Sequence, residues 1–140
     1  MDTKLANRLP TALFLCRLSV FVVLLVWVLD KFINPEHAAA VFAKFYFISG
    51  LSNGMAYVLG ALQLSLVIAF LIGFQKTWSY GLVMLMHGIS TVSSYKQFLN
   101  PYAEANILFF AAIPMLAACV TLFMLRDYDS RWVVDRPTSG

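Results

Sequence analysis

The chain has 140 residues, of which 61% are hydrophobic and only 12% are charged. A water-soluble domain carries about 45–50% apolar and about 25% charged residues, so this chain cannot cover a globule with polar groups. The composition therefore excludes a soluble enzyme, a disordered protein and a nucleic-acid-binding module. The formal net charge is +3. In a membrane protein the positions of lysine and arginine in the loops indicate which side of the membrane each loop lies on.

A helix that spans the hydrocarbon core of a bilayer needs about 20 predominantly apolar residues, within a range of about 17–25. Four stretches of the sequence qualify, at about 12–29, 54–74, 79–94 and 105–125. Their continuous apolar runs lack the alternation of barrel strands, and a helix satisfies its own backbone in lipid. The sequence predicts an all-α membrane protein, with one four-transmembrane-helix bundle over 12–125. A cytoplasmic N-terminus at 1–11 precedes it, and a polar cytoplasmic tail at 126–140 follows.

The first apolar stretch follows a basic segment that contains Lys4 and Arg8, as a signal peptide does. However, the stretch is too long for a signal peptide and ends at Asp30 and Lys31 without a small-residue cleavage motif. We therefore expect it to be retained as the first membrane helix.

The loop after this helix begins with Asn34, Pro35 and Glu36, a residue order typical of a helix start. Apolar residues then recur at helical spacing, with Lys44 on the opposite face. The pattern predicts a short amphipathic helix over 35–47 that lies in the membrane interface.

Three polar side chains fall inside the predicted membrane helices. Gln63 and His87 lie near the midpoints of the second and third helices, and Arg17 lies roughly 7–8 Å inside the first. Polar groups at this depth have no partner in lipid, so they are candidate functional residues. We expect Arg17, Gln63 and His87 to face the interior and to line one shared polar cavity.

Each of these residues also has a purely structural interpretation. Arg17 can extend its charge to the headgroups, and Gln63 and His87 can form hydrogen bonds between helices. In the functional interpretation, Arg17 binds an anion, a lipid phosphate or a carbonyl group. His87 then forms a hydrogen bond with a quinone-like headgroup or accepts a proton from it. Both interpretations stay open at this point.

Further polar residues share these regions and are secondary candidates for ligand binding. Some lie at the outer end of the first helix and others on the His87 face of the third. They are Asp30, Lys31, Tyr80, Thr91 and Ser94.

Cofactor-binding patterns are sparse. No metal site is predicted, because the sequence has only two histidines and His37 lies outside the membrane helices, away from His87. Cys16 and Cys119 fall at similar depths, which allows a redox pair, but packing is favoured because the predicted side is reducing. The sequence has no CxxC pair, no set of mid-membrane histidines for haem and no nucleotide-binding loop. We therefore expect no intrinsic cofactor and no self-contained redox enzyme.

Two runs of the sequence are similar to the DoxX family of small bacterial membrane proteins. They are CRLSVFVVLLVWVLDKFINP and YVLGALQLSLVIAFLIG. Arg17 and Lys31 match an arginine in the family's first helix and a lysine at its outer end. Gly60, Gln63 and Gly73 match its second helix.

Two positions depart from this family pattern. Val28 replaces a frequent glycine, and the uncharged Gln63 stands where a carboxylate is common. If that carboxylate supports a family chemistry, this chain lacks it.

The resemblance implies a multi-pass protein of the bacterial cytoplasmic (inner) membrane. It also implies a small membrane subunit associated with a quinone-linked oxidoreductase or a redox or stress complex. The ligand that the resemblance implies is a quinone. The expected partners are the lipid bilayer and other membrane subunits. The chain can also form oligomers, and no nucleic-acid partner is expected. The alternative is a non-catalytic assembly or scaffold subunit, which small residues on the helix faces would suit. A transporter or channel is the weakest hypothesis, because few charged residues are available to line a pore.

The distribution of basic residues predicts that both termini are cytoplasmic. Six lie on the side of the termini: Lys4, Arg8, Lys76, Arg126, Arg131 and Arg136. Three lie on the other side: Lys31, Lys44 and Lys96.

This orientation is tested by single cysteines in a background in which both native cysteines are alanine. We expect Ser52→Cys to react with a membrane-impermeant maleimide in intact cells, and Ser139→Cys to react only after permeabilisation. Labelling of Ser139→Cys in intact cells would show that the orientation is wrong.

Overall fold

The computed structural model describes residues 3–135, which form helices and connecting loops without a strand. The elements follow one another as α1 (Thr3–Ile33), α2 (Pro35–Tyr46), α3 (Asn53–Leu71), α4 (Lys76–Ser93), α5 (Tyr95–Leu99), the 3₁₀ helix η1 (Asn106–Ala111) and α6 (Ala112–Met124). The prediction of an all-helical protein is confirmed. Residues 136–140 of the predicted tail lie outside the described residues.

Three helical segments within 3–135 are long and apolar enough to cross a membrane. They are α1, α3 and the continuous segment Asn106–Met124, which joins η1 to α6. The predicted stretch at 79–94 coincides with α4 except for Ser94, which follows the helix, and α4 is not among the three. Its lysine, histidine, serine and threonine residues lower its mean hydropathy.

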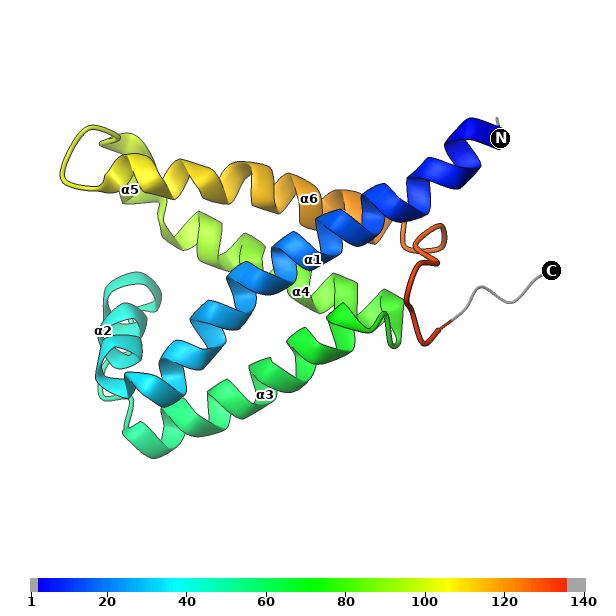
Figure 1. Cartoon of the computed structure of the whole chain (residues 1–140). Coiled ribbons are helices and arrows are strands. Elements are labelled where there is room, and N and C mark those ends of the chain that lie inside the picture. The colour runs from blue at the N-terminus through cyan, green and yellow to red at the C-terminus, as the bar shows by residue number, and fades with distance from the viewer. Residues whose placement is uncertain (1–2, 136–140) are drawn as a thin grey trace.

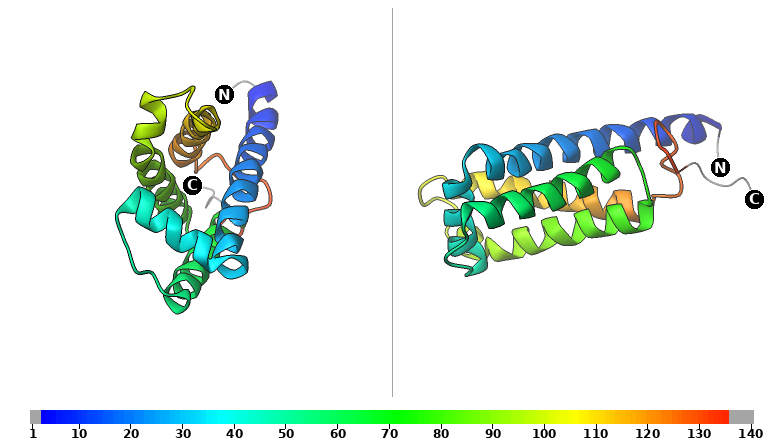
Figure 2. Two further views of the ribbon diagram at one scale, coloured as in Figure 1. Left: turned by 90° about the vertical axis from the view of Figure 1, so that its left-hand side faces the viewer. Right: turned by 90° about the horizontal axis from the view of Figure 1, so that it is seen from below.

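The long helices pack side by side, as Figure 2 shows. α1 packs mainly along α3 and also contacts α6, while α4 packs along α6 and α3. α2 lies across one end of the assembly, against α1 and α3 (Figure 1). A helix is therefore present where the sequence predicts one at 35–47.

α1 turns one face toward the other helices. Its buried residues recur every three or four positions: Leu13, Arg17, Val20, Leu24, Val28 and Lys31. This spacing places them on a single stripe of the helix. Large apolar residues such as Val22 and Val26 lie on the opposite, exposed face, as suits a helix in contact with lipid.

The last apolar segment begins as a 3₁₀ helix and becomes an α-helix just before Pro114. In the structure Pro114 lies in the first turn of α6, where a missing N–H group costs little.

The chain after α6 folds back against the end of α3. The backbone N–H groups of Val134 and Asp135 donate to the carbonyls of Ile72 and Gly73, at 2.8 and 3.3 Å. Gly73 has a φ of +61°, and a β-carbon there would lie 2.5 Å from a methyl carbon of Val133. Glycine at this position thus permits both the turn and the close approach of the tail.

We expect Gly73→Ala to destabilise the protein more than Gly50→Ala. Gly50 has a φ of +80°, but a β-carbon there would have open space around it, so alanine would introduce the backbone strain without a clash. The clash with Val133 should add about 1–3 kcal/mol to the loss in free energy of unfolding. Thermal unfolding in detergent measures the difference, and equal effects of the two substitutions would contradict close packing of the tail.

Candidate functional site

Arg17 lies fully buried on the interior stripe of α1. Its Nη1 donates to the Tyr80 hydroxyl and to Oδ2 of Asp129, both at 2.9 Å. Its Nη2 donates to the backbone carbonyls of Arg131, at 2.6 Å, and Trp132, at 3.3 Å. The guanidinium therefore binds the folded-back tail to α1.

Asp129 is fully buried as well and completes a three-residue cluster. The Tyr80 hydroxyl donates to its Oδ2 at 2.8 Å, and Nζ of Lys76 donates to its backbone carbonyl at 3.1 Å. A charge buried away from water is tolerated when it is paired and hydrogen-bonded. The cluster pairs the two charges, while Nε of Arg17 and Oδ1 of Asp129 are buried without a hydrogen-bond partner among residues 3–135.

The environment of the Asp129 carboxyl combines opposing effects on its pKa. Burial raises the pKa above its ordinary value, whereas the Tyr80 hydrogen bond and the charges of Arg17 and Lys76 lower it. Loss of Arg17 would remove one of the opposing effects and raise this pKa further.

Arg17 does not share a cavity with Gln63 and His87, so this part of the predicted geometry is wrong. The Asp129 carboxylate holds the guanidinium at the tail end of the helices, and Arg17 is not among the residues that line the cavity described next. It does not extend into solvent either. Asp129 was not predicted from the sequence. The helical spacing of Arg17 with Leu13 and Val20 was an available signal that Arg17 is buried, but it did not identify the partner.

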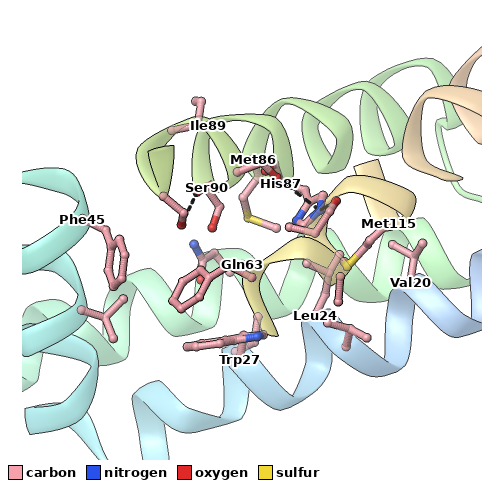
Figure 3. Close-up of a pocket in the computed structure, with 18 of the residues that line it drawn as sticks. Val20, Leu24, Trp27, Phe45, Gln63, Met86, His87, Ile89, Ser90 and Met115 are labelled. Atoms are coloured by element: carbon pink, nitrogen blue, oxygen red, sulfur yellow. Dashed lines mark hydrogen bonds between the residues drawn. The ribbon is translucent and has the colours of Figure 1, made fainter. Parts of the chain in front are cut away.

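A cavity of about 760 Å³ lies between α1, α2, α4, η1 and α6, with one contribution from α3. Its size falls within the range of about 300–1,000 Å³ that is typical of small-molecule sites. The walls are mostly apolar and aromatic, as Figure 3 shows for Leu24, Trp27, Phe45 and Met115. Trp27 also contributes to the exposed surface of α1, so the cavity wall reaches the surface of the protein there.

His87 lines this cavity and connects α4 to α6. Its Nε2 lies 3.1 Å from the carbonyl oxygen of Ala112. Because a carbonyl only accepts, Nε2 carries the proton in this hydrogen bond, and Nδ1 of the neutral ring is the acceptor. Thr91, on the next turn, donates its hydroxyl to the His87 carbonyl at 2.8 Å. Nε2 of His87 thus forms a hydrogen bond between two helices, which is the structural interpretation of His87 drawn from the sequence.

Gln63 is the α3 residue in the cavity wall, and its side chain is half-buried. In Figure 3 it points toward the part of α4 that carries Ser90. Within residues 3–135 its amide has no hydrogen-bond partner. The structure therefore brings Gln63 and His87 to one cavity and leaves the amide available to a ligand.

The secondary candidates divide between the cavity and other places. Lys31, Thr91 and Ser94 line the cavity. Tyr80 belongs to the Arg17 cluster, and the Asp30 carboxylate pairs with Nδ1 of His37 at 2.7 Å, outside the large cavity.

The cysteines and possible metal ligands form no additional site. Cys16 and Cys119 are free thiols, and Cys119 is part of the hydrophobic core. In the described part of the chain, no three histidine, cysteine or acidic side chains lie close enough to hold a metal ion. No family model, no curated protein and no solved structure matches this chain.

We expect Arg17→Met or Asp129→Leu to cost about 3–5 kcal/mol of unfolding free energy, because each leaves the opposite charge buried and unpaired. The double variant should recover much of the loss. Arg8→Met, which removes an exposed arginine from the same helix, serves as the control.

Thermal unfolding in detergent measures these losses, and trypsin cleavage after Arg131 reports release of the tail. Additive losses in the double variant would contradict a direct ion pair.

Proposed function

We propose that the chain is a DoxX-like protein of the bacterial cytoplasmic membrane with four transmembrane helices. In this proposal α4 spans the membrane in addition to the three apolar segments named above. The support for α4 is that its polar residues turn inward: Ser79 and Tyr80 are buried, and His87 and Thr91 line the cavity. A helix with this arrangement presents apolar residues such as Leu82 and Leu85 outward, toward lipid.

In the same proposal α2 is an interfacial helix. It lies across the ends of α1 and α3, and its Val41, Phe42 and Phe45 face the cavity. Lys44 lies on its exposed side. This division between an apolar and a polar face suits a helix in the plane of the interface.

We propose further that the protein is a small membrane subunit of a quinone-linked oxidoreductase or redox complex. In this role it binds an amphiphile with a hydrogen-bonding headgroup. The observation that carries this proposal is the apolar cavity, whose wall reaches the protein surface at Trp27 and which contains the unpartnered amide of Gln63. The resemblance to the DoxX family favours a quinone as the ligand.

The cavity offers a quinone both kinds of hydrogen bond. The Gln63 amide nitrogen donates to a carbonyl oxygen, and Nδ1 of His87 accepts from a hydroxyl of the reduced form. Aromatic walls such as Trp27 and Phe45 suit a planar ring. A partner subunit would carry the redox cofactor in this arrangement.

A non-catalytic assembly subunit is the alternative function. It is favoured by the His87–Ala112 hydrogen bond, which makes His87 a packing residue, and by the close contact of Gly81 with Phe123. Such a subunit would need no ligand in the cavity.

Ligand retention distinguishes the two functions. We expect quinone to be extracted from protein purified in mild detergent, and Gln63→Leu to weaken the binding of added quinone about five- to tenfold, as expected for one lost hydrogen bond. His87→Phe should have a similar or larger effect without unfolding the protein. Gln97→Leu, outside the cavity, serves as the control.

Solvent extraction followed by chromatography measures the retained quinone, and quenching of Trp27 fluorescence measures added quinone. A wild-type protein that neither retains nor binds quinone, together with a His87→Phe variant that only loses thermal stability, would favour the assembly function.

A further inference from the structure

The cavity contains one positive charge and no negative one. Of the side chains from residues 3–135 that line it, Lys31 is charged, and none is an aspartate or a glutamate. Lys31 is only 8% exposed and occupies the last position of the interior stripe of α1. A buried ammonium in an apolar wall normally has an anion beside it, because desolvation of the charge is costly.

Among residues 3–135, no carboxylate forms an ion pair with Lys31. Its Nζ donates to the Trp27 carbonyl at 3.2 Å and lies 5.9 Å from the centre of the Phe42 ring. An ammonium has three donors, so donors remain after these contacts. The adjacent carboxylate, Asp30, is bound to His37, and these two residues line a separate, smaller pocket with Trp27.

The rest of the cavity wall is mostly apolar, as suits a hydrocarbon chain. Ser94 also lines the cavity and is as buried as Lys31. From there the wall continues along α1 through Leu24 and Val20 to Ser19. At about 1.5 Å per residue, Lys31 and Ser19 are about 18 Å apart along the helix axis.

We propose that the cavity binds an amphiphile with an anionic headgroup, a carboxylate or a phosphate. The Lys31 ammonium pairs with this headgroup, and the hydrocarbon chain lies along α1 toward Ser19. This inference rests on the proposed function, in that the cavity must take up an amphiphile. It narrows the headgroup from any hydrogen-bonding group to an anion.

In the proposed orientation, Lys31 lies at the outer end of α1, at the level of the headgroups. An anionic group bound there stays near the membrane surface while its chain follows the apolar wall inward. Pairing with a charge-assisted hydrogen bond would satisfy the donors that the protein leaves free.

The test uses the full chain in detergent, with Trp78→Phe and Trp132→Phe so that Trp27 in the cavity wall is the fluorophore. Brominated lipids quench this fluorescence on contact. The probes are dibromostearate, its neutral methyl ester and a brominated phosphatidic acid. The variants are Lys31→Met, Lys31→Arg and, as a matched control, Lys44→Met, which removes an exposed lysine outside the cavity.

We expect at least one of the two anionic probes to bind about tenfold more tightly than the ester. Lys31→Met should remove this preference, whereas Lys31→Arg and Lys44→Met should retain it. The stronger of the two anionic probes identifies the headgroup as a carboxylate or a phosphate. Thermal unfolding of each variant confirms that it is folded, and the arginine variant keeps the test valid if Lys31→Met unfolds.

Two results would overturn the inference: equal affinity for the ester and both anions in the parent protein, or a preference for anions that survives in folded Lys31→Met. Loss of the preference in Lys31→Arg would also overturn it if Lys31→Met does not fold. Binding of quinone and ester without a role for Lys31 would leave the proposed function standing. Failure of every probe, quinone included, would overturn both.

Discussion

The fold depends on a guanidinium that cannot remain unpaired inside a helical interior. Arg17 is fully buried in α1, and the carboxylate that neutralises it, Asp129, comes from the chain after α6. Tyr80 of α4 joins the same cluster, so one interaction ties the first helix, an internal helix and the tail together. The tail in turn reaches the end of α3, where Gly73 leaves space for Val133. This end of the molecule is therefore closed by charge pairing, with local packing around it.

The interior stripe of α1 carries two cations with different surroundings. Arg17 has an anion, a hydroxyl and backbone carbonyls around it, which makes it structural. Lys31, at the other end of the stripe, meets a carbonyl of its own helix and an aromatic face. The residues between them, such as Val20 and Leu24, line the cavity and are apolar. Arg17 forms an ion pair with a carboxylate and Lys31 does not, so an anionic ligand of the cavity would meet its electrostatic partner at the Lys31 end.

Much of the helical organisation follows from local sequence. Long apolar runs predict helices, and Asn34 with Pro35 marks the start of α2 where the structure has it. The stretch predicted as one helix over 105–125 begins in the structure as the 3₁₀ helix η1 and continues as α6. This transition before Pro114 depends on packing as well as on the proline. Gln63 and His87 line one cavity, since residues at equal positions along connected helices can share a wall, but its walls are mostly apolar and not polar as predicted from the sequence. Asp129 was missed, because an acidic residue in a polar segment gives no local sign of burial.

The sequence by itself determined that this chain is helical and apolar enough for a membrane, and how far along its helix each polar residue lies. Those properties depend on composition and on the rise of a helix, both of which are local. Only the tertiary structure decided which partner each polar residue has. Arg17 and Asp129 are 112 positions apart in the sequence, and depth along a helix says nothing about which neighbour a side chain faces. Arg17 and Lys31 are both basic residues of one apolar helix in the sequence. They differ in the structure because the tail folds back to Arg17 and not to Lys31.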